Sequence, residues 1–247
     1  MPFEDYGATG KHTETHTEAL KVAKLGTRLQ LEDGRVFHYA RANGALLVGQ
    51  LCQGAAAVAN HDEDLAVAST AIGATEVSVT FGATAITLNQ YENGYLYVNN
   101  GTGEGAVYTI DSHVADAGGQ AFTVPLKDDG GLRVALVNGD STVGVMGNPW
   151  ADVIQYPTTI TGMAAGVSPV AVDDDAYFWC QTWGPAAIFV DLSTHAIGTA
   201  IEPSAAKAGA VDLYDRSGSV DQPMIGQAMN VAATDDEYHM FFLTIAP

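Results

Sequence analysis

The first residues with a chemical pattern lie near the start of the chain. The segment HTETHTE carries alternating histidine and glutamate side chains, at positions His12, Glu14, His16 and Glu18. In an extended segment these four side chains would lie on one face, because strand side chains repeat every two residues. A structural zinc site needs ligands fixed in a tetrahedral cage. Since the surrounding residues supply few apolar anchors, we predict no metal site here.

Two acidic clusters in the C-terminal half are further candidates for cation binding. Residues 173–175 are three consecutive aspartates, and residues 234–237 read Thr-Asp-Asp-Glu. Calcium is bound by clustered carboxylates, but adjacent residues of a strand point to opposite faces. We therefore predict two solvated turns, each ahead of an apolar strand.

A glycine-rich loop at residues 99–105, NNGTGEG, has the composition of a phosphate-binding loop. A P-loop requires Lys followed by Ser or Thr, and a dinucleotide-binding loop requires a helix after the glycines. Neither is present, because Gly105 leads into the strand-like sequence AVYTI. The glycines supply positive backbone angles at little cost, which is typical of a turn between two strands. We predict no cofactor site.

The remaining histidines and carboxylates show no catalytic spacing. Asp111, Ser112 and His113 are adjacent, but a nucleophile, its base and an orienting group must meet in space beside an oxyanion site. We therefore predict no catalytic residues and a protein that is not an enzyme. A carboxylate pair of the glycosidase kind stays open, because Asp and Glu are abundant and their separation in space is unknown.

The charge balance is strongly acidic. The 247 residues include 29 Asp and Glu against 10 Lys and Arg, a formal net charge of −19, and after Arg133 the Lys and Arg residues are Lys207 and Arg216. Binding to nucleic acid depends on cationic side chains that displace condensed counterions. The balance therefore excludes nucleic acid as a partner and favours a soluble protein whose copies repel one another.

The chain shows no sign of secretion or membrane insertion. Its start lacks the basic and apolar regions of a signal peptide, and no run approaches the ~20 apolar residues of a membrane helix. Cys52 and Cys180 lie far apart in apolar surroundings, which predicts buried free thiols. These features favour synthesis and folding in a cytoplasm, with no membrane partner.

The elements that would position all these residues are short strands. Residues 25–41 predict two strands joined at Asp33-Gly34, a dipeptide that favours tight hairpin turns. Residues 75–81 and 84–90 alternate at period two and predict a second hairpin around Gly82. Further short strands are predicted at 45–51, 94–100, 105–112, 120–126, 131–137, 168–172, 176–184, 185–191, 208–214, 223–231 and 237–245.

This pattern predicts an all-β fold, an antiparallel sandwich or barrel of jelly-roll-like type. Residues 1–24 have few apolar residues and predict an extended, mobile arm. We divide the rest into a main β-domain at 25–140, a linker or connecting loops at 141–162, and a second β-region at 163–247. That second region either completes the first sheet or builds a smaller β-domain.

Several stretches resemble structural proteins of tailed bacteriophages. They include LGTRLQLEDGRVFHYARANGALLVGQLCQ near the start and AYFWCQTWGPAAIFVD near the end, together with residues 94–115, 148–172 and 223–245. The resemblance implies a virion protein without enzymatic activity, made in the host cytoplasm. In particular it implies a decoration (cement) protein that binds the outer surface of the icosahedral head and stabilises it. The partners it implies are the major capsid protein and further copies of the chain in a homotrimer.

Two groups of residues are candidates for these contacts. In the arm we expect capsid contacts from Phe3, Tyr6, Lys11 and Lys21, and for core or intersubunit packing we single out the aromatic residues Trp179, Trp183 and Phe189. Large aromatic side chains serve either purpose. Two alternatives stay open: a tail or head-fibre protein that binds a host glycan through exposed aromatic rings, and a secreted carbohydrate-active β-protein.

Overall fold

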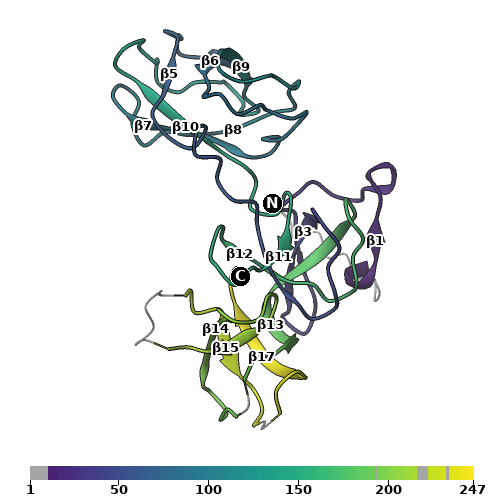
Figure 1. The fold of residues 1–247 in the computed structure, drawn as a ribbon. Coiled ribbons are helices and arrows are strands. Elements are labelled where there is room, and N and C mark those ends of the chain that lie inside the picture. Colours follow the sequence, from purple (N-terminus) through teal and green to yellow (C-terminus); the bar gives the residue numbers. More distant parts are fainter. Residues whose placement is uncertain (1–10, 193, 216–221, 232–233) are drawn as a thin grey trace. The chain divides into compact units, whose positions relative to one another are not determined.

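The computed structural model describes residues 11–192, 194–215, 222–231 and 234–247, and these residues are arranged almost entirely in β-strands (Figure 1). The strands form two antiparallel sheets, one of eleven strands and one of six. Within the described ranges the helical segments are the 3-10 turns η1 (Lys11–Thr13) and η2 (Glu18–Leu20). The predicted all-β, sandwich or barrel class is confirmed.

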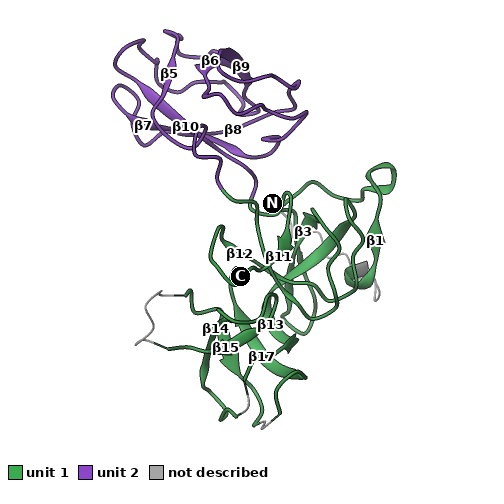
Figure 2. Cartoon of the chain, viewed as in Figure 1, with its two compact units in different colours: residues 1–56, 149–247 green, residues 57–148 purple. Residues whose placement is uncertain are grey.

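The chain forms two compact units, and one of them is inserted into the other (Figure 2). Residues 57–148 form the inserted unit, and residues 1–56 together with 149–247 form the main unit. This division differs from the predicted scheme of 25–140, 141–162 and 163–247. The segment predicted as a linker contains β10 (Thr142–Met146), which pairs with two strands inside the inserted unit. The Gly and Pro content of this segment led to the linker prediction, although the segment contains a central strand of the sheet.

The sheet of the inserted unit curls round until its edges meet. Its order is β8-β7-β10-β5-β6-β9, and an isolated bridge between Ile110 and Leu126 joins the two edges. There the Asp111 N–H donates to the Pro125 carbonyl oxygen over 2.9 Å. Besides β10, the strands are β5 (Leu65–Val67), β6 (Glu76–Thr80), β7 (Tyr95–Asn100), β8 (Val107–Thr109) and β9 (Ala121–Pro125).

The apolar core of the inserted unit follows from the period of its strands. In β6, for example, Val77 and Val79 are fully buried while Glu76 and Thr80 are exposed. Alternate side chains of a strand face opposite sides of the sheet, so each strand contributes every second residue to the interior. The loop after β7 is a turn, as predicted, and Gly101, Gly103 and Gly105 there have positive φ angles.

Two strand predictions in the inserted unit are wrong. Residues 84–90 form no strand beside β6, whose neighbours are β5 and β9, and Ile86 makes only an isolated bridge. Residues 131–137 likewise contribute a single bridge, through Leu136. Ile86, Leu132 and Leu136 are buried in the core, so these segments supply one or two apolar side chains each from turns. A local apolar pattern does not distinguish that arrangement from a strand.

The main unit is built around one long strand, β13 (Tyr177–Phe189), of 13 residues. Its residues 177–183 pair with β3 and its residues 183–189 pair with β17. We call residues 177–182 the N-half and residues 183–189 the C-half. The separate strands predicted at 176–184 and 185–191 are therefore wrong. One strand continues through Gly184, which has a positive φ of 86°, and Pro185, although this dipeptide is typical of a turn.

The N-half of β13 belongs to a curled sheet around one apolar core. The strands of this part are β2 (Arg28–Gln30), β3 (Val36–Arg41), β4 (Leu51–Gln53), β11 (Ile154–Gln155) and β12 (Ala164–Val167). A parallel bridge between Ala42 and Val153 links the end of β3 to the start of β11. Cys52 and Cys180 are buried free thiols in this core, as predicted.

The C-half belongs to a second curled part with a core of its own. Its other strands are β14 (Ala200–Pro203), β15 (Val211–Leu213), β16 (Gly226–Ala228) and β17 (Tyr238–Thr244). A parallel bridge between Val190 and Val211 returns β15 to the end of β13. One strand thus serves two cores, and the register shift between Gln181 and Trp183 places these cores on opposite faces of the strand.

Candidate interaction surface on the long strand

Side chains of β13 alternate between the two cores and the outer side of the sheet. Phe178 and Cys180 belong to the core beside the N-half, and Ala186 and Ile188 belong to the core beside the C-half. Side chains of a strand alternate between its two faces, so within each half the odd-numbered residues point away from that half's core. The outer side carries Tyr177, Trp179 and Gln181 on the N-half, and Trp183, Pro185, Ala187 and Phe189 on the C-half. A register shift between Gln181 and Trp183 reverses the alternation, so these two outer sides lie on opposite faces of the sheet.

Over the N-half, the outer side is a buried aromatic cluster. It consists of Leu29, Phe37, Tyr39, Tyr177 and Trp179. Trp179 is only 3% exposed, so this residue is a core residue, one of the two uses predicted for it. A second layer of apolar side chains packs against the cluster: Ala23, Leu25 and Leu31.

Residues 11–25 supply much of this cover. In β1 (Thr15–His16) the two residues pair with Phe178 and Tyr177 of β13. The His12 ring lies 5.2 Å from the Phe37 ring between centroids. Residues 11–24 thus lie against the main unit, which differs from the predicted mobile arm. The apolar partners that hold the segment are distant in sequence, so its own composition does not reveal them.

The predicted capsid-contact residues of the arm have different placements. The Lys21 ammonium lies 2.9 Å from the Glu18 carboxylate and 5.4 Å from the centroid of the Tyr177 ring. The Glu18 carboxylate also accepts a hydrogen bond from the Tyr177 hydroxyl, and this bond, with Lys21, lowers the pKa of Glu18. Phe3 and Tyr6 lie outside the described residues. The backbone of Lys11 lies in η1.

Over the C-half, the outer side is partly exposed: of its side chains and those of the paired strand, four are exposed and four are half-buried. We call the following eight outward side chains of β13 and β17 the exposed ladder: Trp183, Pro185, Ala187, Phe189, Tyr238, Met240, Phe242 and Thr244. Tyr238 is 49% exposed and Met240 40% exposed. The Trp183 ring packs edge-on against the Phe242 ring at 5.7 Å, and the Phe189 ring lies 5.7 Å from the Tyr238 ring. All eight side chains are uncharged.

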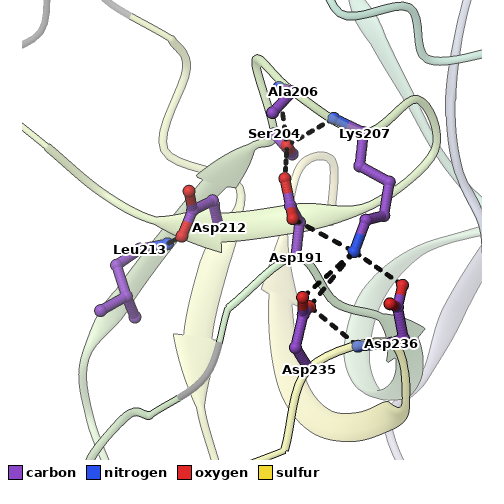
Figure 3. A network of polar contacts seen from close by, with 8 residues as sticks. All are labelled: Asp191, Ser204, Ala206, Lys207, Asp212, Leu213, Asp235 and Asp236. Carbon is purple, nitrogen blue, oxygen red and sulfur yellow. Dashed lines mark hydrogen bonds and ion pairs between the residues drawn. The ribbon is translucent and has the colours of Figure 1, made fainter.

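At the Phe189 end, the ladder meets a network of charged residues centred on Lys207. Figure 3 shows the polar contacts of this network. The Lys207 ammonium lies 5.6 Å from the centroid of the Phe189 ring. It also lies 3.2 Å from a carboxylate oxygen of Asp191, 3.2 Å from one of Asp235 and 2.7 Å from one of Asp236. We call these four charged residues the Lys207 network.

The Lys207 network has an excess of negative charge, since one ammonium faces three carboxylates. The hydrogen bond to Asp236, followed by those to Asp191 and Asp235, raises the pKa of Lys207. Nearby, burial raises the pKa of Asp212, and the charges of Asp191 and Asp235 add to this effect. The ammonium therefore stays protonated and holds two turns of the main unit together at the edge of the exposed ladder.

The other residues considered from sequence serve as turn or core residues. His113 lines a hollow of about 460 Å³ in the inserted unit, but the Tyr91 N–H donates to its Nε2 and its Nδ1 donates to the Val114 carbonyl oxygen. Its two ring nitrogens therefore serve the loop backbone. At residues 173–175, Asp174 accepts a bond of 2.6 Å from the Gly44 N–H. Across the described ranges, no group of three His, Cys, Asp or Glu is placed to hold a metal ion.

The sequence analysis identifies candidates for the exposed ladder on β13 and none on β17. Trp183 and Phe189 were candidates, whereas Tyr238, Met240 and Phe242 were not. A signal was available: the segment YHMFFL at 238–243 is apolar at both phases of the strand period. A strand of that kind has apolar side chains on both faces of its sheet.

Comparisons of this chain with protein-family models, with curated proteins and with solved structures found no match. Within the described ranges, no helix is long and apolar enough to span a bilayer. What the fold and the exposed ladder define is an all-β protein of two units with an aromatic outer surface on its longest strand. The functional argument therefore depends on this chain's own residues.

Proposed function

We propose that this protein is a structural component of a tailed-phage virion, without enzymatic activity, that binds the outer surface of the head as a decoration protein and stabilises it. Two things support the proposal: the resemblance of its sequence to such proteins, and the exposed ladder. The ladder is the observation that carries it. A contiguous apolar surface that is left open on a folded protein is typical of an interaction site.

The composition of the ladder suits a protein that works through contacts. Trp and Tyr are the residues that most often dominate binding energy at protein interfaces. Their rings combine a large apolar area with few rotatable bonds, so little side-chain entropy is lost on binding. The ladder presents Trp183, Phe189, Tyr238 and Phe242 together on two paired strands. These rings are therefore already held in place before any partner binds.

The negative charge of the chain supports a location outside the shell. A formal charge of −19 opposes close approach to packaged DNA. It also keeps free copies apart and soluble before they assemble. On a shell, many copies bind side by side, so that modest individual contacts become strong through multivalency.

For the capsid contact we retain the first residues of the chain, with one refinement. Lys21 is held by Glu18 and Tyr177 of its own unit, so it has less freedom to reach a shell. We therefore assign the contact with the major capsid protein chiefly to the segment that contains Phe3 and Tyr6, followed by Lys11. The homotrimer that the resemblance implies stays a prediction, and we assign a separate two-fold contact between copies to the outward side chains of β13's C-half and β17.

An alternative is suggested by the same exposed rings. Trp and Tyr side chains have an apolar face and a polar tip, a combination that also suits stacking against sugar rings. The exposed Tyr238, with Trp183 at the other end of the ladder, would then recognise a host glycan in a tail or head fibre. A glycan array probed with the purified protein, and with Trp183→Ala as control, distinguishes this alternative.

The proposal is tested on virus particles. Purified virions of the phage that encodes the chain are separated into heads and tails, and the protein is located by mass spectrometry and by immunogold labelling. We expect it on the outside of heads, and we expect heads that lack it to lose DNA at a lower temperature. Its presence in tails alone, or its absence from virions, would contradict the proposal.

A second arm uses purified protein added back to heads that lack it. The full chain should sediment with these heads, and a variant without residues 1–10 should bind at least about tenfold more weakly, because each tenfold requires only about 1.4 kcal/mol of lost contact. Val107→Glu, in the inserted unit, changes an exposed side chain and serves as the matched control. Equal binding of the truncated and full chains would remove the assignment to the first residues.

A further inference from the structure

We propose that the exposed ladder is a contact between two copies of this chain. The two ladders meet face to face, and β13 of one copy runs in the opposite direction to β13 of the other. This inference deepens the proposed function, on which its biological role rests, by naming the surface through which copies touch. Its test uses the isolated protein, so it can fail while capsid binding holds, and the reverse.

The first argument is the contrast within one strand. On the N-half, the outer aromatic side chains are buried beneath β2 and residues 11–25, and Trp179 is 3% exposed. On the C-half, the outer side of the strand carries Trp183 and Phe189, which are half-buried, and Tyr238 of the paired strand is 49% exposed. Apolar surface of this kind gains roughly 25 cal/mol per Å² when it is removed from water. The C-half therefore has the composition of a covered surface without a cover among the described residues.

The second argument is charge. Copies that each carry −19 repel one another, and this repulsion opposes contact least where the touching surfaces lack acidic side chains. The eight positions of the exposed ladder are all uncharged. The first ten residues of the chain are a less suitable cover, because Glu4 and Asp5 would bring negative charge to an uncharged surface. A second copy presents no such charge if its own ladder faces the first.

The Lys207 network selects the orientation. It lies at the Phe189 end of the ladder and leaves two net negative charges there, since three carboxylates face one ammonium. In a symmetric dimer each copy uses the same patch. If the strands of the two copies run in opposite directions, the Phe189 end of one copy lies on the Trp183 end of the other. The two networks are then at opposite ends of the contact, where their repulsion is weakest.

The size of the patch predicts a weak contact. Met229 extends the ladder sideways, because its N–H donates to the Met240 carbonyl oxygen over 2.9 Å and its side chain is 42% exposed. Seven residues along β17 and three strands across give a footprint of about 23 Å by about 14 Å, or about 300 Å² per copy. Stable complexes bury roughly 800 Å² per partner. We therefore expect a dissociation constant on the order of 100 μM for free copies, which crowding on a shell would overcome.

The test is sedimentation velocity of the full chain from low micromolar to high micromolar concentration, at low and high NaCl. We expect the weight-average sedimentation coefficient to rise with concentration, and to rise more at high salt because salt screens the repulsion between acidic copies. Ala187→Glu should weaken association about tenfold or more, since it places a charge at the centre of the ladder. Ala187 is exposed, so the variant should fold, and near-ultraviolet circular dichroism verifies this.

Two controls make the result specific to the ladder. Val107→Glu adds the same charge to an exposed side chain of the inserted unit and should leave association unchanged. Met240→Ala removes apolar area without adding charge, and it should weaken association less than Ala187→Glu does. If Val107→Glu weakens association as much as Ala187→Glu, net charge rather than the ladder is responsible and the inference is wrong.

The other occupants are distinguished in the same experiment. A chain that stays monomeric at every concentration and at high salt overturns the inference. If such a monomer begins to associate once residues 1–10 are deleted, those residues are the cover of the ladder instead. If the monomer persists after that deletion while added phage heads protect Trp183 from acrylamide quenching, the occupant is the shell.

Discussion

The N-half and the C-half of β13 present the same kind of outer surface with opposite outcomes. Both carry aromatic side chains at alternate positions, with Tyr177 and Trp179 on the first and Trp183 and Phe189 on the second. The N-half is covered by residues 11–25 and β2, whereas the C-half is open. The difference teaches that strand composition sets which side chains face outward, while a segment distant in sequence decides whether that side becomes core or surface.

The largest expected effect tests this contrast directly, by truncating one tryptophan on each half. Trp179→Ala should lower the free energy of unfolding by about 3–5 kcal/mol, because it leaves a large cavity in a buried cluster. Trp183→Ala removes a half-buried ring that packs on Phe242 and should cost less, about 1–2 kcal/mol. Urea unfolding followed by tryptophan fluorescence measures both, since Trp150, Trp179 and Trp183 all belong to the main unit.

A milder variant guards this comparison against outright misfolding. Trp179→Phe keeps an aromatic ring, and the Trp179 indole N–H has no hydrogen-bond partner among the described residues. Its loss therefore costs no bond, and Trp179→Phe should be less destabilising than Trp179→Ala. Equal destabilisation by Trp179→Ala and Trp183→Ala would show that the two halves do not differ in burial as described.

The next effect removes the cover itself. Deleting residues 1–20 removes β1, with its pairing to Tyr177 and Phe178, and the His12 ring that lies on Phe37. We expect a loss of roughly 2–3 kcal/mol in unfolding free energy, from the apolar area that becomes exposed. The matched control is deletion of residues 1–10, which leaves these contacts in place and should change stability little. The measurement is a thermal melt of both variants beside the full chain.

A second readout locates the effect of the longer deletion. Amide hydrogen exchange in β3 should increase, because the cluster around Phe37 and Tyr39 loses part of its outer layer. Exchange in β17, on the open half, should stay unchanged. If both deletions behave alike, residues 11–20 contribute nothing to the cover of the N-half.

Much of this fold could be predicted from the sequence because period-two patterns are local. The hairpin at Asp33-Gly34 has β2 paired with β3 as expected, and Gly34 has a positive φ of 85°. The strand rhythm from residue 94 to residue 126 is confirmed by β7, β8 and β9. In such segments the residues that set the strand and the turn are neighbours in the chain, so the sequence alone contains the information.

The parts that could not be predicted depend on distant contacts. Gly184 and Pro185 are typical of a turn, yet β13 continues through them because β17 pairs with this stretch and the Gln181 side chain donates to the Pro185 carbonyl oxygen over 2.7 Å. The insertion of residues 57–148 could not be predicted either, because the two segments that connect the units resemble ordinary loops in sequence. The candidate surface was predicted in part: Trp183 and Phe189 of β13 were candidates, whereas the β17 residues beside them are identified only by the strand pairing.

Acid should lower the stability of the two halves to different degrees, because a buried histidine lies beside each half. Burial lowers the pKa of His38, which lies in β3 beside the N-half, to about 4 from 6.5, and its ring stacks on Trp150 at 4.1 Å. Burial, followed by the nearby His195, also lowers the pKa of His239 in β17. In both cases the unfolded chain binds the proton more readily than the folded chain does.

The sign of the pH effect follows from these lowered pKa values. Stability that depends on neutral His38 is fully present above pH 6.5 and is lost as pH falls from 6.5 to about 4. The loss from this group is at most about 3 kcal/mol, since each pKa unit corresponds to 1.36 kcal/mol. Urea midpoints measured across this range should fall less steeply in His38→Gln than in the unaltered chain. The same substitution at His239 should flatten the profile less, and an unchanged slope in His38→Gln would contradict the assignment.

The smallest effect compares one lysine from each half. Lys21 pairs with Glu18 on the covered half, and Lys207 binds Asp191, Asp235 and Asp236 at the edge of the open half. Both lysines are partly exposed, so salt screens their contribution and replacing either by Met should lower the melting temperature only slightly. The raised pKa of Lys207 means that its contribution is present at neutral pH and is lost only in strong alkali, above the ordinary lysine value.

The two lysine variants should differ in self-association, and this difference is what sharpens the comparison of the halves. Lys207→Met leaves three carboxylates unneutralised beside Phe189, so it should weaken the contact between copies at low salt and much less at high salt. Lys21→Met removes the same charge from the covered half and should leave association unchanged. Sedimentation velocity of both variants at two salt concentrations decides the point. If they weaken association equally, the loss of a positive charge anywhere on the main unit is sufficient, and the open half has no special part in bringing copies together.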